Sequence, residues 1–316
     1  MKNLIRLALF LPIALAACGG GPEPTQARVR VRVGVLPILD ALPMYVAEAQ
    51  GYFADNGLEV IFVPVASAAE RDQLMQAGQI DGMINDLIST LLYNKNQISV
   101  IAVRFARTAT PEFPQYRILA AAGSGIASVE DLAGVEIGIS EGTVIEYTTY
   151  RLLEAEGLAT EDIRTVAVPR IPDRLALLAS GELQAANLPD PLSSLAIQGG
   201  ATVIIDDSAH PEYGNSLISF RKDFVTQRAQ VIRGFLAAIE AAVADINADK
   251  AAWEDLLVEK ELIPAPLIGE YTIPNFPTAS VPSEAQFADV LQWALDRGLV
   301  QTQLSYSQSI NASFLP

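Results

Sequence analysis

The chain has 316 residues, half of them hydrophobic, with one Cys, one His and a formal net charge of −16. That length fits one large or two medium domains, and only 18% of the residues are charged, which argues against a disordered chain. So acidic a chain lacks the basic surface that nucleic acid requires, and one Cys with one His cannot build a Cys/His zinc site.

The first 17 residues have the pattern of a lipoprotein signal peptide. A basic start precedes an apolar run that is too short to span a bilayer. Leu15-Ala16-Ala17-Cys18 then resembles a bacterial lipobox, so we expect residues 1–17 to be removed and Cys18 to be acylated. An ordinary signal peptide that is cut elsewhere is the alternative. Residues 18–27 are rich in Gly and Pro and predict a flexible tether to the outer face of the cytoplasmic membrane.

The next hundred residues alternate between strand and helix patterns. Val29, Val31, Val33 and Val35 alternate with polar residues or Gly, which is typical of a strand. Further strands are expected over 58–65, 80–84, 98–105 and 116–122, with helices ending near residue 52 and spanning 69–77. Helices of about ten residues between strands predict a parallel sheet of βαβ units.

A weak internal repeat follows this first region. Residues 32–35 match residues 136–139, residues 56–58 match 156–158, and residues 77–81 match 180–184, in the same order and at offsets of about 100. The repeat predicts two similar α/β lobes. Beyond residue 220 the pattern becomes helical, over 224–247, over 251–261, and again after a capping box at Ser283-Glu284-Ala285-Gln286.

Residues 45–53, 56–60, 78–81 and 128–139 together resemble the extracytoplasmic solute-binding lipoproteins of ABC importers. That class serves nitrate, sulfonates, taurine, thiamine precursors and riboflavin. The resemblance implies an α/β type II periplasmic-binding-protein fold, in which two lobes enclose a cleft. We expect residues 28–120 and 221–316 in lobe 1 and residues 121–220 in lobe 2, with hinge crossings near 121 and 217–220.

Small molecules bind outside the carboxyl ends of strands in open parallel sheets and near helix N-termini. This rule selects ten candidate ligand-binding residues: Asp40, Tyr45, Ser67, Asn85, Asp86, Gly142, Thr143, Glu146, Tyr147 and Asp190. Alternatives remain open, because Ser67 and both Asp40 and Asp190 suit helix caps and Gly142 suits a tight turn. The two tyrosines either stack on a ligand or pack in a core.

The candidate loops carry carboxylates, amides and tyrosines, and apart from the turn at Arg170 they carry no Lys or Arg. This favours a neutral heteroaromatic ligand, with riboflavin first and a thiamine pyrimidine precursor second. A sulfonate, taurine or nitrate is the alternative. A pyrimidine-synthesising enzyme is a further alternative, disfavoured because such relatives depend on histidine and His210 lies far from these loops. We expect a monomer without catalytic residues, metal or cofactor that meets a small-molecule ligand, an ABC permease with its ATPase subunits and, through its lipid, the membrane.

Acylation at Cys18 is directly testable. The protein extracted from membranes should begin at Cys18 and carry the mass of attached acyl chains, because the short apolar run ends in a lipobox. Cys18→Ser should release the protein into the soluble fraction. A Cys18→Ser chain that still fractionates with membranes contradicts the prediction.

Overall fold

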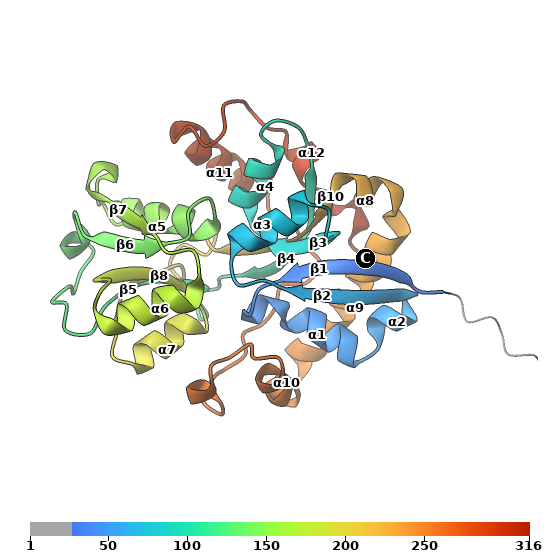
Figure 1. Ribbon diagram of the computed structural model, residues 1–316, viewed down its shortest axis with the longest axis horizontal. Coiled ribbons are helices and arrows are strands. Elements are labelled where there is room, and N and C mark those ends of the chain that lie inside the picture. The colour runs from blue at the N-terminus through green and yellow to red at the C-terminus, as the bar shows by residue number, and fades with distance from the viewer. Residues whose placement is uncertain (1–26) are drawn as a thin grey trace, which may run out of the picture.

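The structure, a computed structural model, describes residues 27–316; the expected signal peptide 1–17, Cys18 and the tether up to residue 26 lie outside the described residues. Two lobes, each built on one five-stranded sheet, lie side by side (Figure 1). The predicted α/β architecture with two lobes is therefore confirmed. Within residues 27–316, no helix has the length and apolar character needed to cross a membrane.

Lobe 1 contains a sheet with the strand order β2-β1-β3-β10-β4. Its strands are β1 (Val29–Val35), β2 (Leu58–Pro64), β3 (Gly82–Asn85), β4 (Val100–Thr108) and β10 (Asn215–Arg221). Strand β1 is parallel to β2 and β3, whereas β10 is antiparallel to both of its neighbours. The helices between them are α1 (Leu42–Ala49), α2 (Tyr52–Asp55), α3 (Ala68–Gln76) and α4 (Leu87–Asn94).

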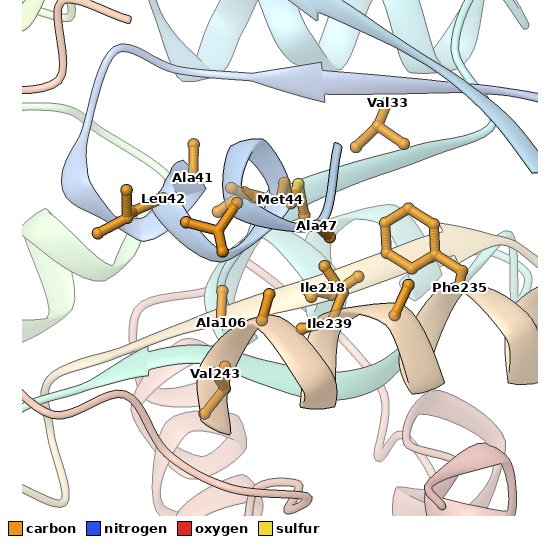
Figure 2. Close-up of a cluster of buried hydrophobic side chains, with 14 of the residues drawn as sticks. Val33, Ala41, Leu42, Met44, Ala47, Ala106, Ile218, Phe235, Ile239 and Val243 are labelled. Atoms are coloured by element: carbon orange, nitrogen blue, oxygen red, sulfur yellow. The ribbon is translucent and has the colours of Figure 1, made fainter. Parts of the chain in front are cut away.

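The core of lobe 1 lies between its sheet and helices α1 and α9 (Ala229–Ala248). Val33 of the sheet faces Met44 of α1 and Phe235 of α9 in one cluster (Figure 2). Helix α9 presents a continuous apolar stripe because its buried residues recur every three or four positions. Each fully buried Ile, Leu, Phe or Val side chain in this stripe contributes about 1.5–3 kcal/mol relative to an exposed one.

Lobe 2 contains a sheet with the order β7-β6-β8-β5-β9. Its strands are β5 (Tyr116–Ala120), β6 (Glu136–Ile139), β7 (Arg164–Ala167), β8 (Ala185–Pro189) and β9 (Thr202–Asp206). Its helices are α5 (Val144–Ala155), α6 (Ile171–Ser180) and α7 (Leu192–Gln198). Strand β5 is antiparallel to β8 and β9, as β10 is to its neighbours in lobe 1.

The internal repeat is visible in these sheets, because β1 and β6 occupy the same place in the two strand orders. Gly34 of β1 and Gly138 of β6 also meet equivalent neighbours. A Cβ added at Gly34 would lie 2.8 Å from Ile80 Cδ1, and one at Gly138 would lie 2.6 Å from Leu183 Cδ1. Both lobes therefore need glycine where a strand passes closely under a side chain.

The C-terminal region folds over both lobes. It contains α8 (Lys222–Gln227), α9, α10 (Glu254–Glu259), α11 (Glu284–Asp296) and α12 (Tyr306–Ser309). The predicted capping box is present: Ser283 accepts from the Gln286 N–H at 3.1 Å, and the Gln286 side chain accepts from the Ser283 N–H at 3.0 Å. The continuous helix expected from residue 224 is interrupted at Arg228, where α8 ends and α9 begins.

The two connections between the sheets lie earlier than expected. They are residues 109–115, between β4 and β5, and residues 207–214, between β9 and β10. The expected crossings, near residues 121 and 217–220, fall after β5 and inside β10 instead. The difference arises because the strand that directly follows each crossing already belongs to the lobe that the chain enters. Strand β5 follows the first crossing and joins the lobe 2 sheet, and β10 follows the second crossing and joins the lobe 1 sheet.

A buried carboxylate ties the two crossings together. Asp207 begins the second crossing, and its Oδ1 accepts from the backbone N–H of Gln115 at 2.7 Å and of Tyr116 at 3.2 Å. Its Oδ2 has no hydrogen-bond partner among the described residues. Burial raises the pKa of Asp207 to about 7, although the two N–H donors and Arg107 oppose the rise.

This carboxylate predicts a pH-dependent stability. Since the folded pKa is raised above the unfolded one, the unfolded chain loses its proton first, and stability falls as pH rises from about 4 to 7. Asp207→Asn keeps one acceptor oxygen but cannot lose a proton. Relative to this variant, the free energy of unfolding of the natural chain should fall by up to roughly 4 kcal/mol over that pH range. Urea unfolding of both chains at pH 4 and pH 8 measures the difference. Parallel stability curves would contradict the assignment.

Candidate functional site

A small cavity lies between the two lobes, at the carboxyl ends of their strands. Its volume is about 60 Å³, well below the roughly 300–1,000 Å³ of ordinary ligand pockets. Its walls include Ile38, Asp40, Ala68, Arg71, Asn85 and Asp86 from lobe 1, and Tyr116, Ser140, Thr143, Val144, Ile145 and Ile171 from lobe 2. The lobes therefore stand close together around a space that only a small group can fill.

Helix starts place the polar side chains of this cavity. Strand β3 ends at Asn85, and Asp86 then caps α4 by accepting from the Ser89 N–H at 2.8 Å. In lobe 2, β6 ends at Ile139 and Thr143 caps α5 by accepting from the Ile145 N–H at 3.2 Å. Asp and Thr are preferred caps because their side-chain oxygens satisfy free N–H groups of the first turn.

Four of the ten predicted residues line the cavity, namely Asp40, Asn85, Asp86 and Thr143. Asn85 is already engaged, since it donates to Thr90 Oγ1 at 3.0 Å and accepts from Ser219 Oγ at 2.6 Å. Their contact with a ligand stays a prediction, and the two aspartates are the groups with the most remaining capacity to accept hydrogen bonds.

Asp86 faces the opposite lobe across the cavity. Besides capping α4, its carboxylate lies close enough to the N–H of Val144, the first residue of α5, for that N–H to lower its pKa. Burial raises the pKa of Asp86 to about 6, against the opposing effects of Arg71 and of the Ser89 and Val144 N–H groups. A carboxylate from lobe 1 thus lies near the N-terminus of a lobe 2 helix, the position that commonly attracts an anion.

Asp40 lies at the base of the cavity beside a buried arginine. Its Oδ1 is 3.7 Å from Arg107 Nη1, and its Oδ2 accepts from Gln115 Nε2 at 3.2 Å. Burial raises the pKa of Asp40, although Arg107 and a hydrogen bond with Ser216 lower it. The carboxylate therefore lines the cavity and is also held by Arg107 and by Gln115 of the first crossing.

Neither predicted tyrosine lies in the cavity wall. Tyr45 packs its ring edge-on against Phe62, with centroids 4.8 Å apart, beneath Lys260. Tyr147 is buried against Trp293 of α11, with centroids 5.5 Å apart, and its hydroxyl donates to Asp289. Both tyrosines therefore fit the alternative of core packing. Their rings contact other parts of the chain, Phe62 and Lys260 for Tyr45 and α11 for Tyr147, and not the cavity.

Four other predicted residues also lie outside the cavity wall. Ser67 caps α3 and accepts from the Glu70 N–H at 3.2 Å, and Glu146 accepts from the Gly142 N–H at 2.7 Å in the turn before α5. Asp190 pairs with Arg117 at 2.9 Å and with Arg107 at 3.5 Å. Burial acts to raise the pKa of Asp190, but the two arginines outweigh it and hold the pKa below its usual range.

Arg71 is a wall residue that the sequence did not reveal, and it overturns the expectation that only the Arg170 turn brings a cation. It lies on α3 and is almost completely buried, with Nη1 donating to the Ile84 carbonyl at 3.1 Å and Nη2 to Ser89 Oγ at 2.9 Å. Its Nη2 also lies 2.7 Å from Asp72 Oδ1. Tyr116, Ser140 and Ser216 complete the polar wall.

Arg174 is the counterpart of Arg71 in lobe 2. The Arg71 side chain packs over Gly34, and the Arg174 side chain packs over the equivalent Gly138. The two arginines are separated in sequence by about 100 residues, as the other matched positions of the repeat are. Arg174 is fully buried, and only its Nη1 has a partner among the described residues, the Val168 carbonyl at 2.8 Å. Burial lowers the pKa of Arg174 to about 9. Alignment of the repeats is the signal that would have pointed to both arginines.

No cluster of three or more His, Cys, Asp or Glu residues that suits a metal ion occurs within residues 27–316. The single histidine stacks on Tyr213, with ring centroids 5.3 Å apart, and is not part of the cavity wall. The cavity therefore combines aliphatic walls, hydroxyl groups, two carboxylates and one guanidinium. Such a set can bind and orient a small molecule.

Comparison with known proteins agrees with this architecture. The chain is 25% identical over 301 residues to an aliphatic sulfonates-binding protein of Escherichia coli K12, covering 94% of this chain and 91% of that protein. It is 26% identical over 273 residues to the riboflavin-binding protein RibY of Chloroflexus aurantiacus, covering 82% of this chain and 73% of that protein.

Solved structures extend the likeness to the fold. The alkanesulfonate-binding protein SsuA of Xanthomonas axonopodis pv. citri, bound to MOPS, superposes with a TM-score of 0.75 at 18% identity, covering 92% of this chain and 99% of that chain. The predicted resemblance to the solute-binding class of ABC importers is confirmed. A family model described as NMT1/THI5 like matches residues 39–252, which include all of lobe 2 and most of the lobe 1 sheet. The chain therefore belongs to the NMT1/THI5-like family.

Proposed function

We propose that this protein captures a small, flat, uncharged heteroaromatic solute outside the cytoplasmic membrane and delivers it to an ABC permease. The observation that carries the proposal is the cavity between the lobes, whose wall presents Asp40 and Asp86 together with aliphatic side chains and the Tyr116 ring. The lipobox at Cys18 and the solute-binding relatives support the location and the transport role.

The balance of charge in the wall supports a ligand that donates hydrogen bonds. The wall contains two carboxylates and one guanidinium, and that guanidinium is already bound by Asp72, Ser89 and the Ile84 carbonyl. An anion entering the cavity would meet Asp86 at the N-terminus of α5, where it would otherwise bind. Ring N–H and amino groups suit the carboxylates instead, because charge-assisted hydrogen bonds are the stronger ones.

The size of the cavity ranks the candidate rings. A volume of about 60 Å³ favours a single ring, so an aminopyrimidine of the thiamine-precursor kind comes first. Riboflavin, favoured by the residue types alone and by the likeness to RibY, comes second because its three fused rings require wider separation of the lobes. Opening and closing about the two crossings would provide that separation.

A sulfonate or another small anion is the second candidate, and a specific observation favours it. Arg174 is fully buried on α6, whose first residue Ile171 lines the cavity, and it has no acidic partner among residues 27–316. Two of its nitrogen atoms are unsatisfied. An anionic head group would supply the missing partner. The names of the Escherichia coli and Xanthomonas relatives point the same way.

An enzymatic role has less support. Histidine-dependent chemistry would have to use His210, which stacks on Tyr213 and lies 3.5 Å from Glu212. His210 lines no part of the cavity. Binding and release of an unchanged solute require only the wall residues and the motion of the lobes.

The deciding experiment compares the natural chain with Asp86→Asn in calorimetry against aminopyrimidines, flavins, taurine, alkanesulfonates and nitrate. Asn is an equally good helix cap, so the fold should persist. For an N–H-bearing ring, Asp86→Asn should weaken binding at least tenfold, because it removes a charge-assisted hydrogen bond worth about 1.5–3 kcal/mol. Exposed Asp55→Asn is the matched control and should leave the affinity unchanged.

Anion binding would give the opposite result. If an alkanesulfonate or nitrate bound at micromolar concentration while rings did not, and Asp86→Asn strengthened that binding, the heteroaromatic assignment would be wrong. Arg174→Gln would then abolish anion binding, since it removes the buried guanidinium.

A further inference from the structure

A second hollow lies at the far end of lobe 1, away from the ligand cavity. Its volume is about 540 Å³, and its walls contain four arginines, Arg30, Arg32, Arg221 and Arg228, against two acidic residues, Asp81 and Asp223. It lies where β1 starts and α8 follows β10, at the right-hand end of the molecule in Figure 1.

This end departs from the charge of the rest of the chain. The hollow and the residues that adjoin or pair with its walls contain three acidic residues, Glu59, Asp81 and Asp223, of the chain's 37. They contain six of its 21 Lys and Arg residues: Arg28, Arg30, Arg32, Arg221, Lys222 and Arg228. A positive end on an otherwise strongly acidic protein makes the charge distribution of the molecule asymmetric. Such an electric dipole orients the protein in front of a charged surface.

The acidic residues in and beside the hollow are fewer than its basic ones: Glu59 pairs with Arg30 at 3.3 Å, and Asp223 pairs with Arg221 at 3.2 Å. Asp81 is buried and binds two arginines, with Arg32 Nη2 at 2.8 Å and Arg221 Nη2 at 3.6 Å. One carboxylate thereby holds two guanidinium groups in place. Lys222 and Arg228 are exposed, and neither side chain has an ion-pair partner among residues 27–316.

The chain also enters the fold at this end. Strand β1 begins at Val29, directly after Arg28, and the proposed acylation site Cys18 is ten residues before Arg28. A fully extended stretch of ten residues spans at most roughly 35 Å. With its lipid at Cys18, the protein therefore keeps the arginine hollow within that distance of the membrane surface.

We propose that the arginine hollow binds the phosphate groups of anionic lipid headgroups and holds this end of lobe 1 against the membrane. The proposal depends on the extracytoplasmic, lipid-anchored location proposed above. Guanidinium groups match phosphate oxygens in paired hydrogen bonds, and clustered basic residues add to the attraction of an anionic surface over about one Debye length. The acidic remainder of the protein is repelled, so the contact is confined to this end.

Vesicle co-sedimentation tests the proposal with residues 19–316, which contain both complete lobes and no lipid. Binding is measured in 20 mM salt to phosphatidylcholine vesicles with and without 30% phosphatidylglycerol. The test variant is Lys222→Glu with Arg228→Glu. Its matched control is Arg164→Glu with Arg170→Glu, which reverses two exposed charges on lobe 2 and has the same net charge.

The expected result is binding to the anionic vesicles only, weakened at least tenfold in the test variant, nearly unchanged in the control and lost at high salt. Equal weakening of both variants would overturn the proposal, because net charge alone would then explain the binding. Micromolar binding of glycerol 3-phosphate without vesicle binding would also overturn it, in favour of a soluble phosphate compound. No solute is present, so failure here leaves the ligand assignment of the cleft untouched.

Discussion

The relation between the two lobes depends on a buried network of charges at their junction. Arg107 stands between Asp40 of lobe 1 and Asp190 of lobe 2, while Asp207 binds the backbone of the other crossing segment. Separating buried partners of this kind costs several kcal/mol, because each charge would be left without compensation. This network therefore holds the two lobes together at their junction.

The two lobes share a scaffold, but equivalent positions in them differ in their chemistry. Arg71 and Arg174 occupy the same place in the two lobes, yet Arg71 is bound by Asp72 and Ser89 while Arg174 keeps two unsatisfied nitrogens. Arg71 lines the cavity as a neutralised cation, whereas Arg174 lies buried behind Gly138 and is not part of the cavity wall. Equivalent positions of the two lobes thus differ in how far their charge is compensated, although the backbone around them is alike.

The fold and the location of the cleft followed from local patterns, such as the alternation in Val29–Val35 and the matched glycines Gly34 and Gly138. The roles of single residues did not, because they depend on distant segments. Tyr147 was indistinguishable from a ligand contact until α11 placed Asp289 and Trp293 on it from more than 130 residues away. The crossings were misplaced for the same reason: nothing local in β5 or β10 records which sheet each one joins.

The placement of β10 in the lobe 1 sheet, after all the strands of lobe 2 in the chain, determines when the lobe 1 sheet can be completed during synthesis. Strand β10 lies between β3 and β4, so the lobe 1 sheet stays divided until residues 215–221 have been synthesised. At 5–20 residues per second, the stretch from the end of β4 to the end of β10 takes about 6–23 s to synthesise. For most of its synthesis the nascent chain lacks the strand that joins β4 to the rest of its first sheet, so that sheet is completed only after the strands of lobe 2 have been made.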